Sequence, residues 1–261
     1  MREEILILEI ASHLEILVAA AKEMARRHKV QQGTELELQI RLAYGGAMLF
    51  RSLNLAECMI WAARAGHGET VAIVARVIGE MLYNVAHAGP DLKGLVDFAI
   101  RGAEERKKWI EKVLEASPGS EKSKDLKDMA RLLQDCLEGQ DCNWERQVRS
   151  RAKSANMDDS YVNEYLMYSE QVHTSSSALD GYISGEAGRL IVNTKIREVL
   201  TKLYLVFGVA QWVELVRRLF AGLPLQESEE FLRAHDGYAK FIDALPKRKD
   251  PSSGESHATE T

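Results

Sequence analysis

Polar side chains interrupt an otherwise apolar stretch between Val71 and Ala88, and they are Arg76, Glu80, Tyr83, Asn84 and His87. At about 100° per residue, a helix places all of them within roughly 100° of one another, so they form one polar stripe. A guanidinium near a carboxylate, an amide and an imidazole is suited to holding an anion. Arg76 would contact the anion and Glu80 would position it, while the amide and the imidazole would add hydrogen bonds.

A second polar set recurs at intervals of four residues: Tyr161, Tyr165, Ser169, His173 and Ser177. Steps of four drift about 40° each around a helix, so the first and last members stand about 160° apart and cannot share a site. The three central members lie within about 80° of one another. A hydroxyl and an imidazole four residues apart can hydrogen-bond, which is the minimum for activating a nucleophile. Ser169 and His173 are therefore the catalytic residues to test, with Tyr165 as a binding residue.

Both stripes also have a structural interpretation. Arg76 and Glu80 have the i,i+4 spacing of an ion pair that would fix helix packing. If that pair is buried, loss of one partner would cost about 3–5 kcal/mol, because the other charge would remain unpaired. His173 lies near an expected helix end, where an imidazolium would interact favourably with the helix dipole. Catalysis by His173 would also need a third group to orient the ring, and Glu80 or Asp180 could serve.

The elements that must position these residues are helical. Periods near 3.6 recur throughout, and no run of alternating, β-branched residues predicts strands. Helices are expected over about 3–28, 34–65, 71–88, 91–115, 122–137, 144–154, from 158 onward, 190–221 and 228–245. The Ser- and Gly-rich stretch 174–188 is expected to be a loop. The sequence therefore predicts an all-α fold, a single multi-helix bundle of about eight to ten helices over residues 1–246, followed by a disordered tail over 247–261.

Composition excludes several classes of protein. The formal net charge is −5, so the surface as a whole should not attract nucleic acid. Apolar residues make up 46% of the chain, which is typical of a globular protein. Three cysteines without CxxC spacing argue against a disulfide framework or a zinc site. Glu9 and Glu15 interrupt the N-terminal apolar stretch, which a signal peptide would not tolerate. A soluble, cytoplasmic, bacterial protein without membrane partners is expected.

Most motifs that carry known chemistry are missing. The chain has no P-loop, dinucleotide-binding fingerprint, HExxH motif or nucleophile elbow. The histidines form no i,i+4 pairs, so neither a metal site nor a cofactor is predicted. A basic run, made of Arg146, Arg149, Arg151 and Lys153, could contact phosphates or form a solvated helix face. Beyond Trp144 it has no interleaved aromatic residues, so base stacking along it is not indicated.

Several spaced residues together resemble a known family: Arg76-x-x-x-Glu80-x-x-x-Asn84, then Trp144, Arg151-Ala152-Lys153, and Tyr165-x-x-x-Ser169-x-x-x-His173. In this order they are similar to a prokaryotic family of helical proteins catalogued only as a domain of unknown function. The resemblance covers about Asn54 to Tyr182. It implies an all-α fold and makes Arg76, Glu80, Ser169 and His173 the positions to test, but it supplies no reaction.

Helical bundles of broadly similar appearance include HEPN-type ribonucleases, whose signature is an arginine followed after four to six residues by a histidine. None of the seven histidines has an arginine at that upstream distance, so the chain departs from that signature. A site assembled from Arg76 and His173 on different helices could still imitate it.

Three hypotheses for function follow. The preferred one is a protein that binds a small anionic or nucleotide-like ligand at a polar cluster between helices. The second is a metal-independent hydrolase or ribonuclease of the defence or toxin type, in which His173 is the acid or base and Arg76 stabilises phosphate charge. The third is an interaction module that uses the charged helix 101–115, with purely structural stripes. RNA and a second copy of the chain are partners compatible with these hypotheses. The first two require Arg76 and His173 to open onto one pocket.

Overall fold

The structure is a computed structural model that describes residues 2–26, 35–117, 123–165, 167–169, 183–186, 189–192, 198–223 and 225–245. His173, Ser177 and Asp180 lie outside these residues, as does the predicted tail 247–261. The statements below concern the described residues.

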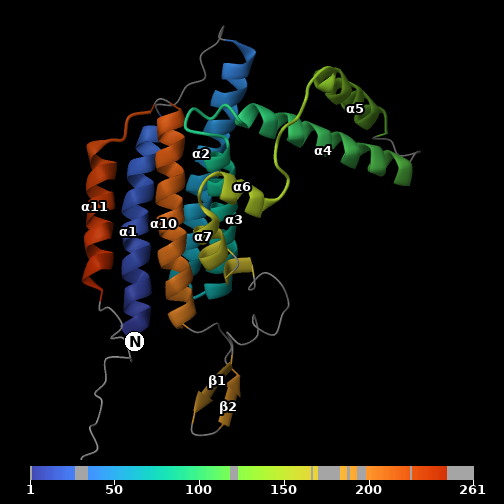
Figure 1. The fold of residues 1–261 in the computed structure, drawn as a ribbon. Helices are drawn as coiled ribbons and strands as arrows, with labels where there is room; N and C mark the ends of the chain where they lie inside the picture. Colours follow the sequence, from blue (N-terminus) through green and yellow to red (C-terminus); the bar gives the residue numbers. More distant parts are fainter. Residues whose placement is uncertain are drawn as a thin grey trace, which may run out of the picture.

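Long helices run side by side as a bundle: α1 (Arg2–Ala25), α2 (Leu36–Arg64), α3 (Gly68–His87), α10 (Glu198–Gly222) and α11 (Glu229–Ala244) (Figure 1). Helix α10 is central, because it packs against α1, α2 and α3, whereas α11 covers the outer side of α1. Periodicity explains the packing. In α1, for example, Ile10, Leu14, Leu17 and Ala21 recur at intervals of three and four and are fully buried.

Smaller elements lie beside this bundle. Helices α4 (Leu95–Ala116) and α5 (Ser123–Leu137) extend away from it, whereas α6 (Val148–Ser154), α7 (Asp158–Ser160) and the π-helix η1 (Tyr161–Tyr165) follow α5 in the chain (Figure 1). Helix α6 and the π-helix both pack on α3. With nine α-helices among the described residues, the predicted all-α bundle is confirmed.

Three predicted helices are wrong in their extent. Residues 190–221 do not form one helix, since α10 begins at Glu198 and is preceded by strands β1 (Ile183–Glu186) and β2 (Arg189–Val192). These pair antiparallel, with Ile183 opposite Val192 and Glu186 opposite Arg189. Gly185 disfavours a helix, and the β-branched residues at 183, 191 and 192 favour extended backbone. The short segments were overlooked because they contain little alternation.

The basic helix predicted from residue 144 begins only at Val148, and the helix predicted from 158 onward is α-helical for Asp158–Ser160 before it changes to a π-helix. A π-turn holds more residues than an α-turn, so it rotates Tyr165 relative to the register that an α-helix would give.

Helices α3 and α10 approach closely because each places glycine at the contact. A Cβ on Gly208 of α10 would lie 2.9 Å from Met59 Sδ and 3.0 Å from Ala75 Cβ, and a Cβ on Gly79 of α3 would lie 2.9 Å from Gln211 Oε1. The indole N–H of Trp212 donates to the carbonyl oxygen of Ser52 at 3.0 Å, which ties α10 to α2 as well.

Among the described helices, α10 alone is long and apolar enough to cross a membrane by length and composition, and 56% of its apolar window is buried inside the bundle. The cytoplasmic location stays a prediction.

A glycine-to-alanine substitution should have opposite effects on stability at a packed helical site and at an open one. Gly208→Ala should lower the free energy of unfolding by about 1–3 kcal/mol, because Ala75 and Met59 leave no room for the methyl group. In α11, a Cβ on Gly237 would meet no atom within 4 Å, so Gly237→Ala should raise it by about 0.5–1 kcal/mol through helix propensity. Urea unfolding followed by circular dichroism measures both. Equal effects of the two substitutions would contradict the packing argument.

Candidate functional site

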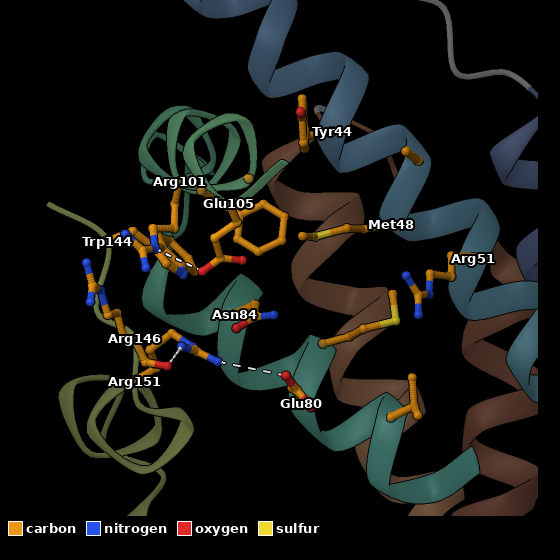
Figure 2. A pocket seen from close by; sticks show the side chains of 15 residues that line it. Tyr44, Met48, Arg51, Glu80, Asn84, Arg101, Glu105, Trp144, Arg146 and Arg151 are labelled. Atoms are coloured by element: carbon orange, nitrogen blue, oxygen red, sulfur yellow. Dashed lines mark hydrogen bonds and ion pairs between the residues drawn. The ribbon is translucent and has the colours of Figure 1, made fainter. Parts of the chain in front are cut away.

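A cavity of about 580 Å³ opens between α2, α3, α4 and the segment that leads from Trp144 into α6 (Figure 2). Four arginines (Arg51, Arg101, Arg146 and Arg151) and two glutamates (Glu80 and Glu105) line it, so the formal charge of its walls is +2. In a chain of net charge −5, this is a local concentration of positive charge.

Helix α3 supplies the polar floor of the cavity. Glu80 and Asn84 are four residues apart and therefore point from the same face of the helix into the cavity (Figure 2). The Glu80 side chain is 43% exposed. Asn84 is only 8% exposed, and its Oδ1 has no hydrogen-bond partner in the described part of the chain. A buried amide oxygen without a partner is costly, so a ligand that donates to this amide would gain affinity from it.

Arg151 reaches the same floor from α6, where it is 5% exposed. Its Nη1 donates to the carbonyl oxygens of Glu145 and Arg146 at 2.7 and 2.8 Å, and its Nη2 lies 4.0 Å from Glu80 Oε1. The guanidinium carbon lies 5.9 Å from the centre of the Trp144 ring. Burial lowers the pKa of Arg151, and the carboxylate of Glu80 opposes that shift. Arginine remains a cation at neutral pH even so, which makes it a fixed positive charge.

The other arginines differ in how far their charge is already compensated. Arg101 donates to Glu104 at 2.7 Å and to Glu105 at 3.0 Å. Arg51 and Arg146 are exposed and form no salt bridge with any residue in the described ranges. Figure 2 shows them on opposite sides of the Glu80–Asn84 floor. Uncompensated cations at the rim favour the entry of an anion.

An aromatic series forms part of the cavity wall. Tyr44 meets Phe98 edge to face at a centroid distance of 6.1 Å, and Phe98 meets Trp144 edge to face at 5.1 Å. The His87 ring also meets Trp144 edge to face, with ring centroids 4.8 Å apart. The cavity therefore combines flat apolar surface with positive charge.

The first predicted stripe is split between two environments. Glu80 and Asn84 line the cavity, but Arg76 does not, and neither does Tyr165 of the second stripe. The Arg76 guanidinium lies over the Tyr165 ring, 5.5 Å from its centre, and its Nε has no hydrogen-bond partner among the described residues. Helical projection gives the reason, since Glu80 and Asn84 are rotated by about 40° and 80° from Arg76 toward the cavity. The ion pair of Glu80 is consequently with Arg151 and not with Arg76.

Arg76 belongs to a neighbouring tyrosine cluster. Tyr83 and Tyr161 pack around Tyr165 with ring centroids 5.9 and 5.0 Å from its own. The Tyr83 hydroxyl lies 3.2 Å from Ser160 Oγ, and burial raises the pKa of Tyr83 to about 12. Ser160 and Gln211 both donate to Glu164 Oε2, at 3.0 and 2.6 Å. Packing and hydrogen bonds thus account for Tyr83, Ser160 and Glu164, whereas Arg76 Nε and Gln211 Oε1 have no hydrogen-bond partner among the described residues.

The proposed catalytic pair is not brought together within the described residues. Ser169 is helical and half-buried, and His173 lies outside the described ranges, so the hypothesis that Arg76 and His173 share one pocket stays untested. No group of three or more His, Cys, Asp or Glu side chains able to hold a metal occurs in the described part of the chain.

Sequence reasoning missed Arg51, Arg101 and Tyr44 as cavity residues, because nothing near them in the chain marks them. For Trp144 and Arg151 a signal existed, since both are part of the spaced pattern that resembles a family. Arg146 and Arg151 also belong to the basic run noted in the sequence. That they line a cavity depends on how α6 packs on α3, which the sequence does not show.

A family profile described as "Family of unknown function (DUF5677)" matches residues 42–189. This range is more than half of the chain. The chain belongs to this family. The predicted family-like core, 54–182, falls inside the match, as does every residue that lines the cavity. No curated protein and no solved structure matches the chain.

The surroundings of His87 in this DUF5677 member predict a pH dependence. Ser154 Oγ donates to the Arg151 carbonyl oxygen at 2.9 Å and lies 2.7 Å from His87 Nδ1, so the hydroxyl oxygen is left to accept a hydrogen bond from His87 Nδ1. Burial, and then the Arg151 cation, lower the pKa of His87, against the smaller opposing effect of Glu145 and Asp97. The unfolded chain therefore binds more protons than the folded one below about pH 6.5, and stability falls as the pH is lowered through that range.

Replacing His87 by Gln should make the free energy of unfolding less sensitive to pH between about 7 and 5, as measured by denaturant unfolding of the two proteins in parallel. Proton NMR should show one ring titrating below about pH 6.5 that is absent from His87→Gln. An identical pH dependence of the two proteins, together with an ordinary ring titration, would contradict the assignment.

Proposed function

We propose that the cavity between α2, α3, α4 and α6 binds a small anionic ligand of the nucleotide type. The observation that carries this proposal is the pairing of uncompensated rim cations, Arg51 and Arg146, with a buried polar floor at Asn84 and Arg151. Rim and floor supply two kinds of contact, one for a charged group and one for hydrogen-bonding atoms.

The size and walls of the cavity suit such a ligand. A volume of about 580 Å³ is within the range of small-molecule sites, which is roughly 300–1,000 Å³. The aromatic series of Tyr44, Phe98 and Trp144 offers apolar surface for a ring system. Phosphate oxygens would accept hydrogen bonds from the rim arginines, whose planar guanidinium groups match them in geometry.

Arg151 is arranged to meet an anion without a large rearrangement. Two backbone carbonyls and the Trp144 ring hold its guanidinium, so little side-chain entropy remains to be lost on binding. The contact of its Nη2 with Glu80 is long, at 4.0 Å. Its Nε has no hydrogen-bond partner in the described part of the chain. A cation in this partly desolvated position attracts a ligand anion more strongly than one in open water.

Glu80 and Asn84 give the cavity selectivity. Both offer acceptor oxygens, whereas an inorganic phosphate dianion has little to donate to them. The amino group or ring N–H of a nucleobase is a donor that fits these oxygens, and the Asn84 amide can also donate to a ring nitrogen or carbonyl. The floor therefore favours a ligand with an amino-bearing base over phosphate alone.

A thermal-shift screen of nucleoside mono-, di- and triphosphates tests the proposal. A ligand at about 100 times its Kd should stabilise the protein by about 2.7 kcal/mol. Arg51→Gln and Arg146→Gln should each weaken that ligand by about tenfold or more, because each removes a charge-assisted hydrogen bond. The matched control is Arg64→Gln, an exposed arginine of α2 that pairs with Glu15 away from the cavity. Absence of any stabilising nucleotide, or equal loss in the control, would overturn the proposal.

Glu80→Gln separates base recognition from phosphate recognition. Removal of this carboxylate should weaken a nucleotide with an amino-bearing base, because its strongest acceptor is lost. The same change should leave inorganic phosphate equally or more tightly bound, because a repelling negative charge is gone from the floor. Isothermal titration calorimetry with each ligand gives the two affinities. A parallel loss of both would assign Glu80 to the structure of the cavity and not to selectivity.

A further inference from the structure

The two rim arginines of the cavity approach it from different walls. Arg51 belongs to α2, and Arg146 belongs to the segment that leads into α6, while both helices pack on α3. Figure 2 shows the two side chains on opposite sides of the floor formed by Glu80 and Asn84. Both arginines are exposed, and neither forms a salt bridge within the described ranges. The cavity therefore has two separate places for negative charge.

The floor between the two arginines is unsuited to an anion. Glu80, Asn84 and Met81 spread over about 100° around α3 and form the arc of the floor. The carboxylate of Glu80 would repel a phosphate placed over the centre of this arc. The buried Oδ1 of Asn84 is an acceptor as well, so it has nothing to donate to a phosphate oxygen. Ligand anions are favoured at the two edges, and a hydrogen-bond donor is favoured between them.

The remaining charged groups near the cavity leave this pattern unchanged. Arg101 pairs with Glu104 and Glu105, so its charge is already compensated. Glu145 does not line the cavity, and its Oε1 accepts a hydrogen bond from the backbone N–H of Gln147 at 2.9 Å. The uncompensated charge of the rim is therefore confined to the two opposed arginines.

Arg151 strengthens one of the two ends. It is buried, and its Nη1 donates to the carbonyl oxygen of Arg146 at 2.8 Å, which places its guanidinium at the same end of the floor. A ligand with phosphate at that end alone would leave Arg51 without a contact. Because the proposed function assigns a phosphate contact to each rim arginine, the opposed geometry requires anionic groups on two sides of the ligand.

We propose, on the basis of the proposed function, that the ligand carries a phosphate on each side of its ribose, as a nucleoside 3′,5′-bisphosphate does. The two phosphates leave the ribose on opposite sides, and the base leaves it in a third direction. One phosphate contacts Arg146 and the other contacts Arg51, while the base passes between them to Glu80 and Asn84. The negative, donor and negative groups of the ligand then match the positive, acceptor and positive groups of the cavity.

Isothermal titration calorimetry of the full chain tests the placement of the phosphates. Adenosine 3′,5′-bisphosphate and adenosine 5′-diphosphate carry the same number of phosphates, on two sides of the ribose and on one. The bisphosphate should have a Kd at least about tenfold lower, because it makes a charge-assisted hydrogen bond at each end. The matching guanosine and cytidine pairs extend the test, since both of their bases also carry an amino group.

The two proposals fail in different ways. If the 5′-diphosphate binds as tightly as the bisphosphate, or more tightly, for every base that binds, the two-sided ligand is wrong and the nucleotide site stands. If none of these nucleotides binds, both proposals are wrong.

A double-mutant cycle checks that the arginines contact different phosphates. Arg51→Gln and Arg146→Gln should each raise the Kd of the bisphosphate about tenfold, and the double variant should raise it about 100-fold, because contacts with separate groups are additive. Arg64→Gln, which breaks an exposed pair with Glu15 away from the cavity, should leave the Kd unchanged. A double variant no weaker than either single one would mean that both arginines share one phosphate, and it would overturn the proposal.

Discussion

Close contact between α3 and α10 is the constraint on which the other elements depend. Gly208 allows α10 to pack directly on Ala75 and Met59, and Gly79 leaves room for the Gln211 side chain. With α10 also against α1 and α2, α3 is held on one side of a rigid core. Its polar stripe is then forced outward, where α4, α6 and the π-helix must cover it or leave it open.

Different elements cover different parts of the polar stripe around the axis of α3. The π-helix and its tyrosines cover the part that holds Arg76 and Tyr83. Helix α6 places Ser154 against His87 and Arg151 near Glu80. Between α6 and α4 nothing in the described part of the chain fills the space above Glu80 and Asn84, and the cavity is what remains. One helix face thereby contributes a packed cluster, a half-buried histidine contact and an open polar floor.

Electrostatics distinguish the cavity from the rest of the surface. The chain as a whole is acidic, with a net charge of −5, yet arginines from α2, α4 and α6 converge at this one place. Backbone carbonyls neutralise part of the cost of burying Arg151, whereas Arg51 and Arg146 remain free for a ligand within the described part of the chain. Under the proposed function the desolvated cation and the rim cations would have separate roles, one holding an anion in place and the others attracting it.

The sequence by itself determined the helical class, the main helices and the polar stripe on α3, because apolar residues at helical intervals carry that information locally. The spaced residues between α3 and the second stripe also indicated a helical family of unknown function, and the DUF5677 match covers that part of the chain. Local patterns did not show the β1–β2 pair, whose strands are too short for alternation, or the π-turn that rotates Tyr165. Only the tertiary structure decided that Glu80 faces Arg151 and not Arg76, and that Arg51, Arg101 and Tyr44 join them. Those residues are far apart in the chain, and the packing of α2, α4 and α6 around α3 alone determines their distances.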